Sequence, residues 1–168
     1  MRFETDAPST KKTLSETFLE LVNTADSEKE ISIISVAFKA NVHRNTIYYH
    51  FSDMRELVLW TIHDTISAPH ECSDRDFICD YVTRNKKLLN FAKSVLGTDG
   101  FIEKMRYEMI PILEKLCYDV PNVETKTYVV ESFAEQIIVA FMLQEKPYNA
   151  IAMIFDYIVP EMKKHSIV

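Results

Sequence analysis

Glycine occurs only twice among the 168 residues of this chain. Tight hairpin turns and phosphate-binding loops depend on glycine, because it adopts backbone conformations that other residues avoid. The chain is 47% hydrophobic, so it can bury a full core. The sequence therefore predicts an all-α protein of about eight helices.

The segment 31–57 is the stretch where residue identity, and not only hydrophobic spacing, indicates a task. Ser32 can cap a short helix over 33–40, whose apolar positions recur at spacings of three, four and seven. Asn41 follows, and asparagine tolerates the left-handed conformation that a sharp turn between helices needs. A second short helix is expected over 44–51.

The outer face of this second helix is polar, aromatic and basic, because only Ile47 and Phe51 are clear core anchors. Two short helices joined by a three-residue turn, the second with such a face, describe a helix-turn-helix that places its second helix in the DNA major groove. The alternative is a structural helical hairpin with surface tyrosines.

The same segment resembles a known family. The residues Val36-Ala37, Ala40-Asn41-Val42, Thr46-Ile47-Tyr48-Tyr49-His50-Phe51 and Leu57 resemble the DNA-binding signature of TetR-type (TetR/AcrR) transcriptional regulators, here in a short form. The resemblance extends from Lys11 to Trp60. The family usually has glycine where this chain has Asn41 and serine where it has His43, and it often has a phosphate-binding lysine where this chain has Met54.

The resemblance implies contacts with double-stranded DNA from Lys11, Lys12, Ser32, His43, Arg44, Asn45, Thr46, Tyr48, Tyr49, His50 and Arg55. Arg44 and Asn45 lie at the start of their helix, where side chains reach base edges. The sugar-phosphate contacts are expected from Thr46, Tyr48, His50 and Arg55, with Lys11 or Lys12.

The net charge of −6 opposes DNA binding mildly, because phosphate neutralisation supplies much of DNA affinity. The net charge of the segment 31–60 is positive, unlike that of the whole chain, because its basic residues outnumber its acidic ones: Lys39, Arg44 and Arg55 against Asp53 and Glu56. This thin basic patch predicts modest affinity that depends strongly on salt.

Three regions are expected along the chain. Residues 1–52 form the DNA-binding domain, whose first helix begins near Ser9 or Thr10 and braces the other two. Residues 53–67 form a connecting helix, started by a capping box in which Asp53 and Glu56 each bond the other's amide. Residues 68–168 form a domain for ligand binding and dimerisation.

In this last region, one long helix is expected from Ser73 to a stop at Gly97, with a turn over 98–100. A further helix is expected over 101–118, bent or split at Pro111. The last two helices are expected over 122–144 and from Pro147.

The run 137–143 is apolar all round, which favours contact with a second copy of the chain. The expected dimer interface comprises Phe133, Ile137, Phe141, Ile151, Ile154, Phe155, Ile158 and Met162. The alternative is that these residues form an ordinary bundle core inside a monomer.

The resemblance also implies a pocket for a small apolar or amphipathic effector. Adaptable methionine and aromatic side chains suit such a pocket, and the candidates are Phe77, Tyr81, Phe101, Met105, Met109 and Cys117, although for any single one of them the sequence favours core packing. His63, Arg84 and Arg106 are polar candidates in the same region. No cofactor is expected, and His63, His70, Cys72 and Cys79 lack the spacing of a common metal site.

No apolar run reaches the length of a membrane span, so no membrane partner and a cytoplasmic location are expected. The favoured interpretation is a homodimeric DNA-binding transcriptional regulator, most often a repressor released by its ligand. The alternative is a helical interaction protein with a degenerate DNA-binding unit, which acts through a protein partner. An enzyme is the third interpretation, without a phosphate loop or nucleophile motif to support it.

Overall fold

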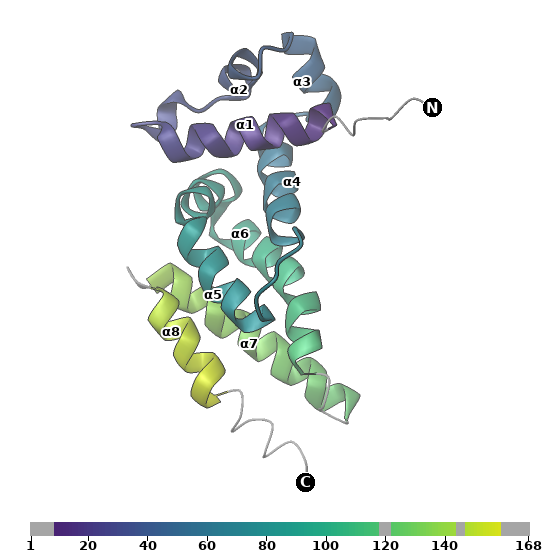
Figure 1. The fold of residues 1–168 in the computed structure, drawn as a ribbon, viewed down its shortest axis with the longest axis vertical. Coiled ribbons are helices and arrows are strands. Elements are labelled where there is room, and N and C mark those ends of the chain that lie inside the picture. Colours follow the sequence, from purple (N-terminus) through teal and green to yellow (C-terminus); the bar gives the residue numbers. More distant parts are fainter. Residues whose placement is uncertain (1–8, 118–121, 144–146, 159–168) are drawn as a thin grey trace.

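The computed structural model describes residues 9–117, 122–143 and 147–158, and its helices confirm the all-α prediction (Figure 1). The described part contains α1 (Thr10–Thr24), α2 (Ile33–Lys39), α3 (Arg44–His50), α4 (Met54–Ile66), α5 (Asp74–Arg84), α6 (Lys86–Leu116), α7 (Val123–Leu143) and α8 (Pro147–Met153), with a 3-10 turn at Glu28–Glu30 and a π turn at Ile154–Ile158. Helices α1 to α3 form one end of the molecule, and α4 leads from them into a bundle of α5 to α8. No helix in the described ranges is both long and apolar enough to cross a membrane.

The helix α1 braces the end that contains α2 and α3. It begins where the Ser9 hydroxyl accepts a hydrogen bond from the Lys12 amide at 3.3 Å. Its side chains Leu14 and Phe18 are fully buried, as are Ile47 of α3 and Phe51 just after it. Replacing one such side chain by alanine typically costs about 2–5 kcal/mol, so the position of α3 depends on this small core.

The turn between α2 and α3 has the predicted geometry. Asn41 has a φ of 53°, the left-handed conformation, and it is the one non-glycine residue with a positive φ in the described ranges. Ser32 and Ser35 form a reciprocal cap at the start of α2, in which each hydroxyl accepts the other residue's amide at 3.1 and 2.8 Å. The helix ends at Lys39, one residue earlier than expected.

The helix α4 begins with a cap that differs slightly from the predicted box. Asp53 accepts the Glu56 amide at 2.9 Å, as expected. Glu56 reaches one residue further back and accepts the Ser52 amide at 2.7 Å. This hydrogen bond lowers the pKa of Glu56. Farther along α4, the buried Thr61 accepts a hydrogen bond from Ser15 of α1 at 3.0 Å, which joins the two helices.

The helix boundaries in the bundle differ from those predicted. The expected helix to Gly97 ends instead at Arg84, because Asn85 bonds the Tyr81 carbonyl through both its backbone amide (2.9 Å) and its side-chain amide (3.0 Å). The expected helix stop at Gly97 is confirmed, because its non-helical backbone, with φ 74° and ψ 169°, forms a kink that divides α6 into two helical segments. The expected turn at 98–100 is helical, and α6 continues without a break through Pro111.

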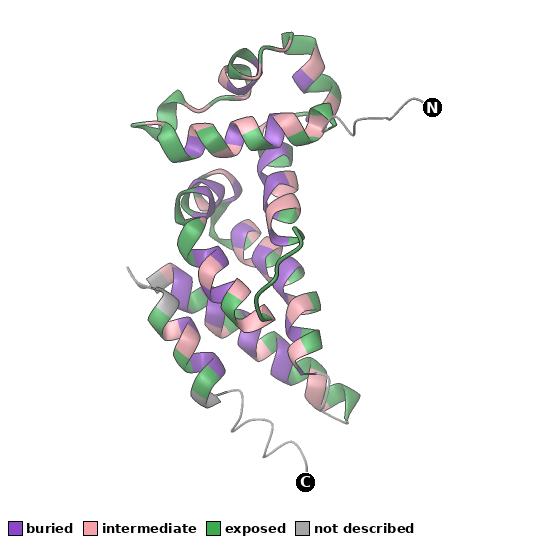
Figure 2. Ribbon diagram, viewed as in Figure 1, coloured by how far each residue is buried: buried purple, intermediate pink, exposed green. Residues whose placement is uncertain are grey.

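The proposed dimer residues form part of the bundle core instead (Figure 2). Six of them are buried within the single chain: Phe133, Ile137, Phe141, Ile151, Ile154 and Phe155. They are covered because α8 packs against α5 and α7 of its own chain. Their burial therefore needs no second copy, contrary to the sequence argument. The side chain of Ile158 and all of Met162 lie outside the described residues.

Candidate nucleic-acid interface

The helix α3 is fixed by one buried side chain, Ile47, and directs most of its other side chains outward. Arg44 and Asn45 are exposed at its first turn, and Tyr49 is 85% exposed. The Arg44 guanidinium lies 5.4 Å from the centre of the Tyr48 ring, a cation–π distance that orients it along the helix. The outer face of α3 thus presents hydrogen-bond donors and aromatic rings without covering them.

Two of the predicted DNA-binding residues serve as helix caps. The Nδ1 atom of His43 accepts the Asn45 amide at 3.2 Å at the start of α3. The hydroxyl of Ser32 accepts the Ser35 amide at the start of α2. A DNA contact would have to use what these bonds leave available, which is the second ring nitrogen of His43 and the hydroxyl hydrogen of Ser32.

The remaining predicted contacts lie around α3 and the start of α1. The ammonium of Lys11 lies 5.2 Å from the centre of the Phe51 ring and 5.4 Å from that of Trp60, so it rests on an aromatic pair. Lys12 is exposed one residue later. Thr46 and His50 are half-buried. The structure thus brings Lys11 to the end of α3 and leaves Lys12 open to solvent.

Arg55 has a partner on the bundle that the sequence did not predict. Its guanidinium donates to the Leu96 carbonyl on α6 at 3.4 Å, at the kink formed by Gly97. A side chain at Gly100 would meet this guanidinium at 3.1 Å, so the glycine leaves the space that Arg55 needs. Arg55 therefore contacts the bundle through one guanidinium nitrogen, while the residue as a whole is exposed.

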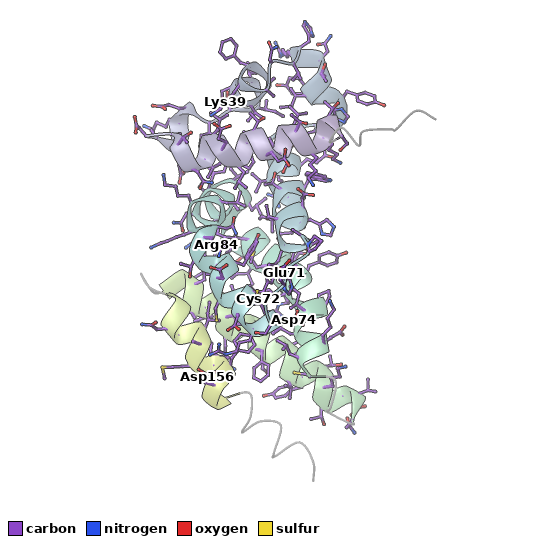
Figure 3. The ribbon with its side chains drawn as sticks, viewed as in Figure 1. Lys39, Glu71, Cys72, Asp74, Arg84 and Asp156 are labelled. Atoms are coloured by element: carbon purple, nitrogen blue, oxygen red, sulfur yellow. The ribbon has the colours of Figure 1, made fainter. Side chains whose placement is uncertain are left out.

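The basic patch is smaller than the charge count suggested. The ammonium of Lys39 lies 2.8 Å from a carboxylate oxygen of Glu20 on α1 (Figure 3). With Lys39 neutralised and Arg55 turned to α6, Arg44 is the only basic residue of the counted three that has no acidic or carbonyl partner in the described ranges. Lys12 adds a second exposed cation to this end of the molecule.

A second cation also joins the α1–α3 end to the bundle. Lys87 of α6 donates to the Asn23 carbonyl near the end of α1 at 2.7 Å. Arg55 thus donates from α4 to a carbonyl of the bundle, and Lys87 donates from the bundle to a carbonyl of α1. Each carbonyl lies close to the end of a helical segment. Such carbonyls lack partners inside their own helix and favour cations.

The predicted effector residues separate into two groups. Phe77 and Tyr81 line a cleft of about 540 Å³ beside the segment 67–73, where Figure 3 labels Glu71 and Cys72. The Tyr81 hydroxyl lies 2.9 Å from that of Thr65, and burial raises the pKa of Tyr81. The other four candidates are buried core residues and do not line this cleft: Phe101, Met105, Met109 and Cys117.

One charged residue of the bundle core was missed by the sequence reasoning. Glu108 is buried, with 5% of its side chain exposed, and its carboxylate contacts His63 and Lys104. The available signal was its position, because Glu108 lies seven and three residues after the core residues Phe101 and Met105. No group of three or more histidine, cysteine, aspartate or glutamate side chains in the described ranges is placed to hold a metal ion.

Comparison with known proteins supports the fold. No family model matches the chain, and no curated protein matches its sequence. One similar solved structure is the crystal structure of the TetR family repressor AlkX from Dietzia sp. strain DQ12-45-1b, which is implicated in biodegradation of n-alkanes. The two superimpose with a TM-score of 0.62 at 16% sequence identity, over 93% of this chain and 96% of that chain.

This chain has a TetR-like fold. The residues that carried the family resemblance, from Thr46 to Phe51, form most of α3 and its C-terminal cap within this fold. The bundle of α5 to α8 is part of the same likeness, because the superposition covers nearly the whole chain.

Proposed function

We propose that this protein is a DNA-binding transcriptional regulator that acts as a homodimer, as a repressor released by a small amphipathic ligand. The TetR-like fold supports the proposal, and the outer face of α3 carries it. A short helix with one buried side chain and exposed arginine, asparagine and tyrosine side chains is suited to the major groove. Arg44 and Asn45, at the first turn, are assigned to base edges.

The proposed sugar-phosphate contacts come from the periphery of α3. Lys12 is exposed, and Lys11 lies at the Phe51 and Trp60 rings, within reach of a strand that passes the end of α3. Tyr48, Tyr49, Thr46 and His50 supply hydroxyl and imidazole groups for the backbone. Arg55 is not included, because its guanidinium binds the Leu96 carbonyl.

The proposed dimer contact uses the outer face of α7. Tyr128 is 68% exposed and Val139 is 45% exposed. The two positions are eleven residues apart, about three helical turns, so both side chains lie on one face of α7, with the exposed Glu131 and Glu135 between them. These two apolar side chains are assigned as the anchors of a symmetric contact in which the same surface is used twice.

The test is fluorescence anisotropy with two labelled duplexes, the region upstream of the protein's own coding sequence and a scrambled duplex of equal composition. We expect tighter binding to the upstream duplex, and an affinity that falls linearly on a log–log scale with salt. Equal and weak binding to both duplexes across the salt series would contradict the proposal.

A second function is favoured by one surface, the outer face of α2. Ile34 and Phe38 lie one turn apart on this helix, 50% and 87% exposed. Together with Met54 in place of the usual lysine, these side chains favour a protein partner at this end of the molecule. This alternative predicts that the anisotropy experiment fails while the fold remains intact.

A further inference from the structure

A cleft lies between the end of α4, the segment 67–70 and the second half of α6. Its volume is about 670 Å³, within the range of small-molecule sites. Much of its wall is apolar, including Ile66, Pro69, Ile110 and Pro111. None of the six effector candidates from the sequence lines this cleft.

A buried ionic group forms one side of the cleft. The Nδ1 atom of His63, on α4, lies 3.0 Å from one carboxylate oxygen of Glu108, on α6, and 3.2 Å from the other. Lys104 donates to the same carboxylate from one turn earlier on α6. Because Nδ1 faces the carboxylate, it carries the hydrogen of this contact, and Nε2 is the ring nitrogen left for a ligand.

The buried charge of Glu108 and the proline at position 111 each stabilise the fold less than an apolar residue with a backbone amide would. A buried charged group contributes less than a well-packed apolar side chain of similar size. Pro111 lacks the amide that would bond the Tyr107 carbonyl within the helix. Glu108, Pro111 and Tyr107 all line the cleft. Costly residues gathered at one cavity indicate a binding site.

The charges that line the cleft favour an anionic ligand. The carboxylate of Glu108 is already engaged by Lys104 and His63, so it offers little to a cation. Lys115 also lines the cleft, and its ammonium has no partner in the described ranges. It lies seven residues after Glu108 on α6, which is about 10 Å along a helix. The apolar wall lies between these two polar ends.

We propose that this cleft binds an amphipathic carboxylic acid. The carboxylate pairs with the ammonium of Lys115, and the apolar body lies along Ile110, Pro111 and Ile66 toward His63. Charge-assisted hydrogen bonds to the carboxylate select the acid over a neutral or cationic molecule of equal length. The role of this ligand as the effector of a regulator rests on the proposed function. The binding of the ligand to the cleft does not depend on that function.

Isothermal titration calorimetry on the full chain tests the binding site. The probes are decanoate, decan-1-ol and decylamine, each below the concentration at which it aggregates. We expect decanoate to bind at least about tenfold more tightly than the alcohol or the amine, as is typical of one charge-assisted hydrogen bond. Lys115→Gln should remove this preference for the acid and leave alcohol binding unchanged.

Lys93→Gln is the matched control, because Lys93 lies on the same helix and does not line the cleft. It should bind decanoate as the unmodified protein does. Equal binding of the three probes, no binding of decanoate, or an unchanged acid preference in Lys115→Gln would overturn the inference.

The anisotropy assay, repeated with decanoate, separates this inference from the proposed function. Selective decanoate binding by a protein that shows no preference between duplexes would support the cleft and contradict the regulator. Selective duplex binding without decanoate binding would support the regulator and overturn the cleft. Release of the upstream duplex by decanoate, absent in Lys115→Gln, would support both.

Discussion

The sequence assigned both the outer face of α3 and the α7–α8 pair to contacts with partners. In the structure, the face of α3 is exposed and the assigned residues of α7 and α8 are buried. Tyr49 of α3 is 85% exposed, whereas Phe133 and Ile151 are covered by their own chain. A face rich in donors stays at the surface, because burial would leave those donors unpaired. An apolar face is covered by whichever apolar surface is within reach. Amphipathic spacing therefore predicts that a face is buried, but not which chain buries it.

The largest expected effect separates the core of α7 from its outer face. Ile137→Glu places a charge in a fully buried position and should lower the free energy of unfolding by about 4 kcal/mol or more. Val139→Glu, at a 45% exposed position, should keep the fold and separate the subunits. Urea unfolding measures the first effect and sedimentation velocity the second.

Ile34→Glu is the control for Val139→Glu, because Ile34 is similarly exposed, at 50%, but lies on α2. It should leave the assembly unchanged. A Val139→Glu protein that sediments as the unmodified dimer would show that the outer face of α7 is not the contact.

The next effect compares two arginines that the sequence assigned to different DNA contacts, Arg44 to base edges and Arg55 to the sugar-phosphate backbone. Arg44→Ala should weaken binding to the upstream duplex by about 1–3 kcal/mol and reduce discrimination from the scrambled duplex. Arg55→Ala should leave the salt dependence unchanged, because its guanidinium binds the Leu96 carbonyl. Lys12→Ala, at an exposed cation, should reduce the salt slope by about one.

Anisotropy across a salt series measures all three variants. A salt slope reduced equally by Arg55→Ala and Lys12→Ala would place Arg55 at the DNA after all.

A smaller effect concerns the turn that orients α3. Asn41 has a φ of 53°, so Asn41→Ala should lower the free energy of unfolding by about 1 kcal/mol. Asn41→Gly should be neutral or stabilising, since glycine adopts this conformation without a steric cost. Urea unfolding of both variants checks the sign, and equal stability of the two would contradict the conformational argument.

The smallest effect compares acid sensitivity at the two ends of the molecule. The pKa of Glu56 is lowered by the Ser52 amide, and that of Asp76 by the Ser73 hydroxyl and then by Arg75. A carboxyl whose pKa is lower in the folded state stabilises the fold above its unfolded pKa, and this contribution disappears as pH falls through the folded value. Both side chains are exposed, so the losses should be small.

Thermal unfolding between neutral pH and pH 3 measures these losses. Glu56→Gln and Asp76→Asn should each show a shallower loss of stability in acid than the unmodified protein. A steeper loss in either variant would contradict the assigned hydrogen bonds.

The N-terminal helices were predictable because their signals are local. Ser9 and Asp53 cap helices through residues three positions away, and Asn41 ends α2 through its own backbone. Such interactions are encoded in adjacent residues, so a short window of sequence contains the whole cause.

The bundle was less predictable because its determinants act over long distances. The end of α5 at Asn85 depends on a side chain that competes with the helix, a choice that the sequence leaves open. The Arg55 guanidinium lies where a side chain at Gly100, forty-five residues later, would come within 3.1 Å of it. The pairing of His63 with Glu108 likewise joins residues forty-five apart, which hydrophobic spacing does not reveal.

Both glycines of the chain lie within one short stretch of α6, and their constraints are opposite in kind. At Gly97 nothing lies within 4 Å of an added methyl group, so the backbone conformation is the constraint. A D-alanine fits the φ of 74°, and an L-alanine does not. At Gly100 an L-alanine matches the helical backbone, but its methyl group meets Arg55 at 3.1 Å. Chemical synthesis with mirror-image residues would therefore distinguish a position defined by chirality from one defined by volume.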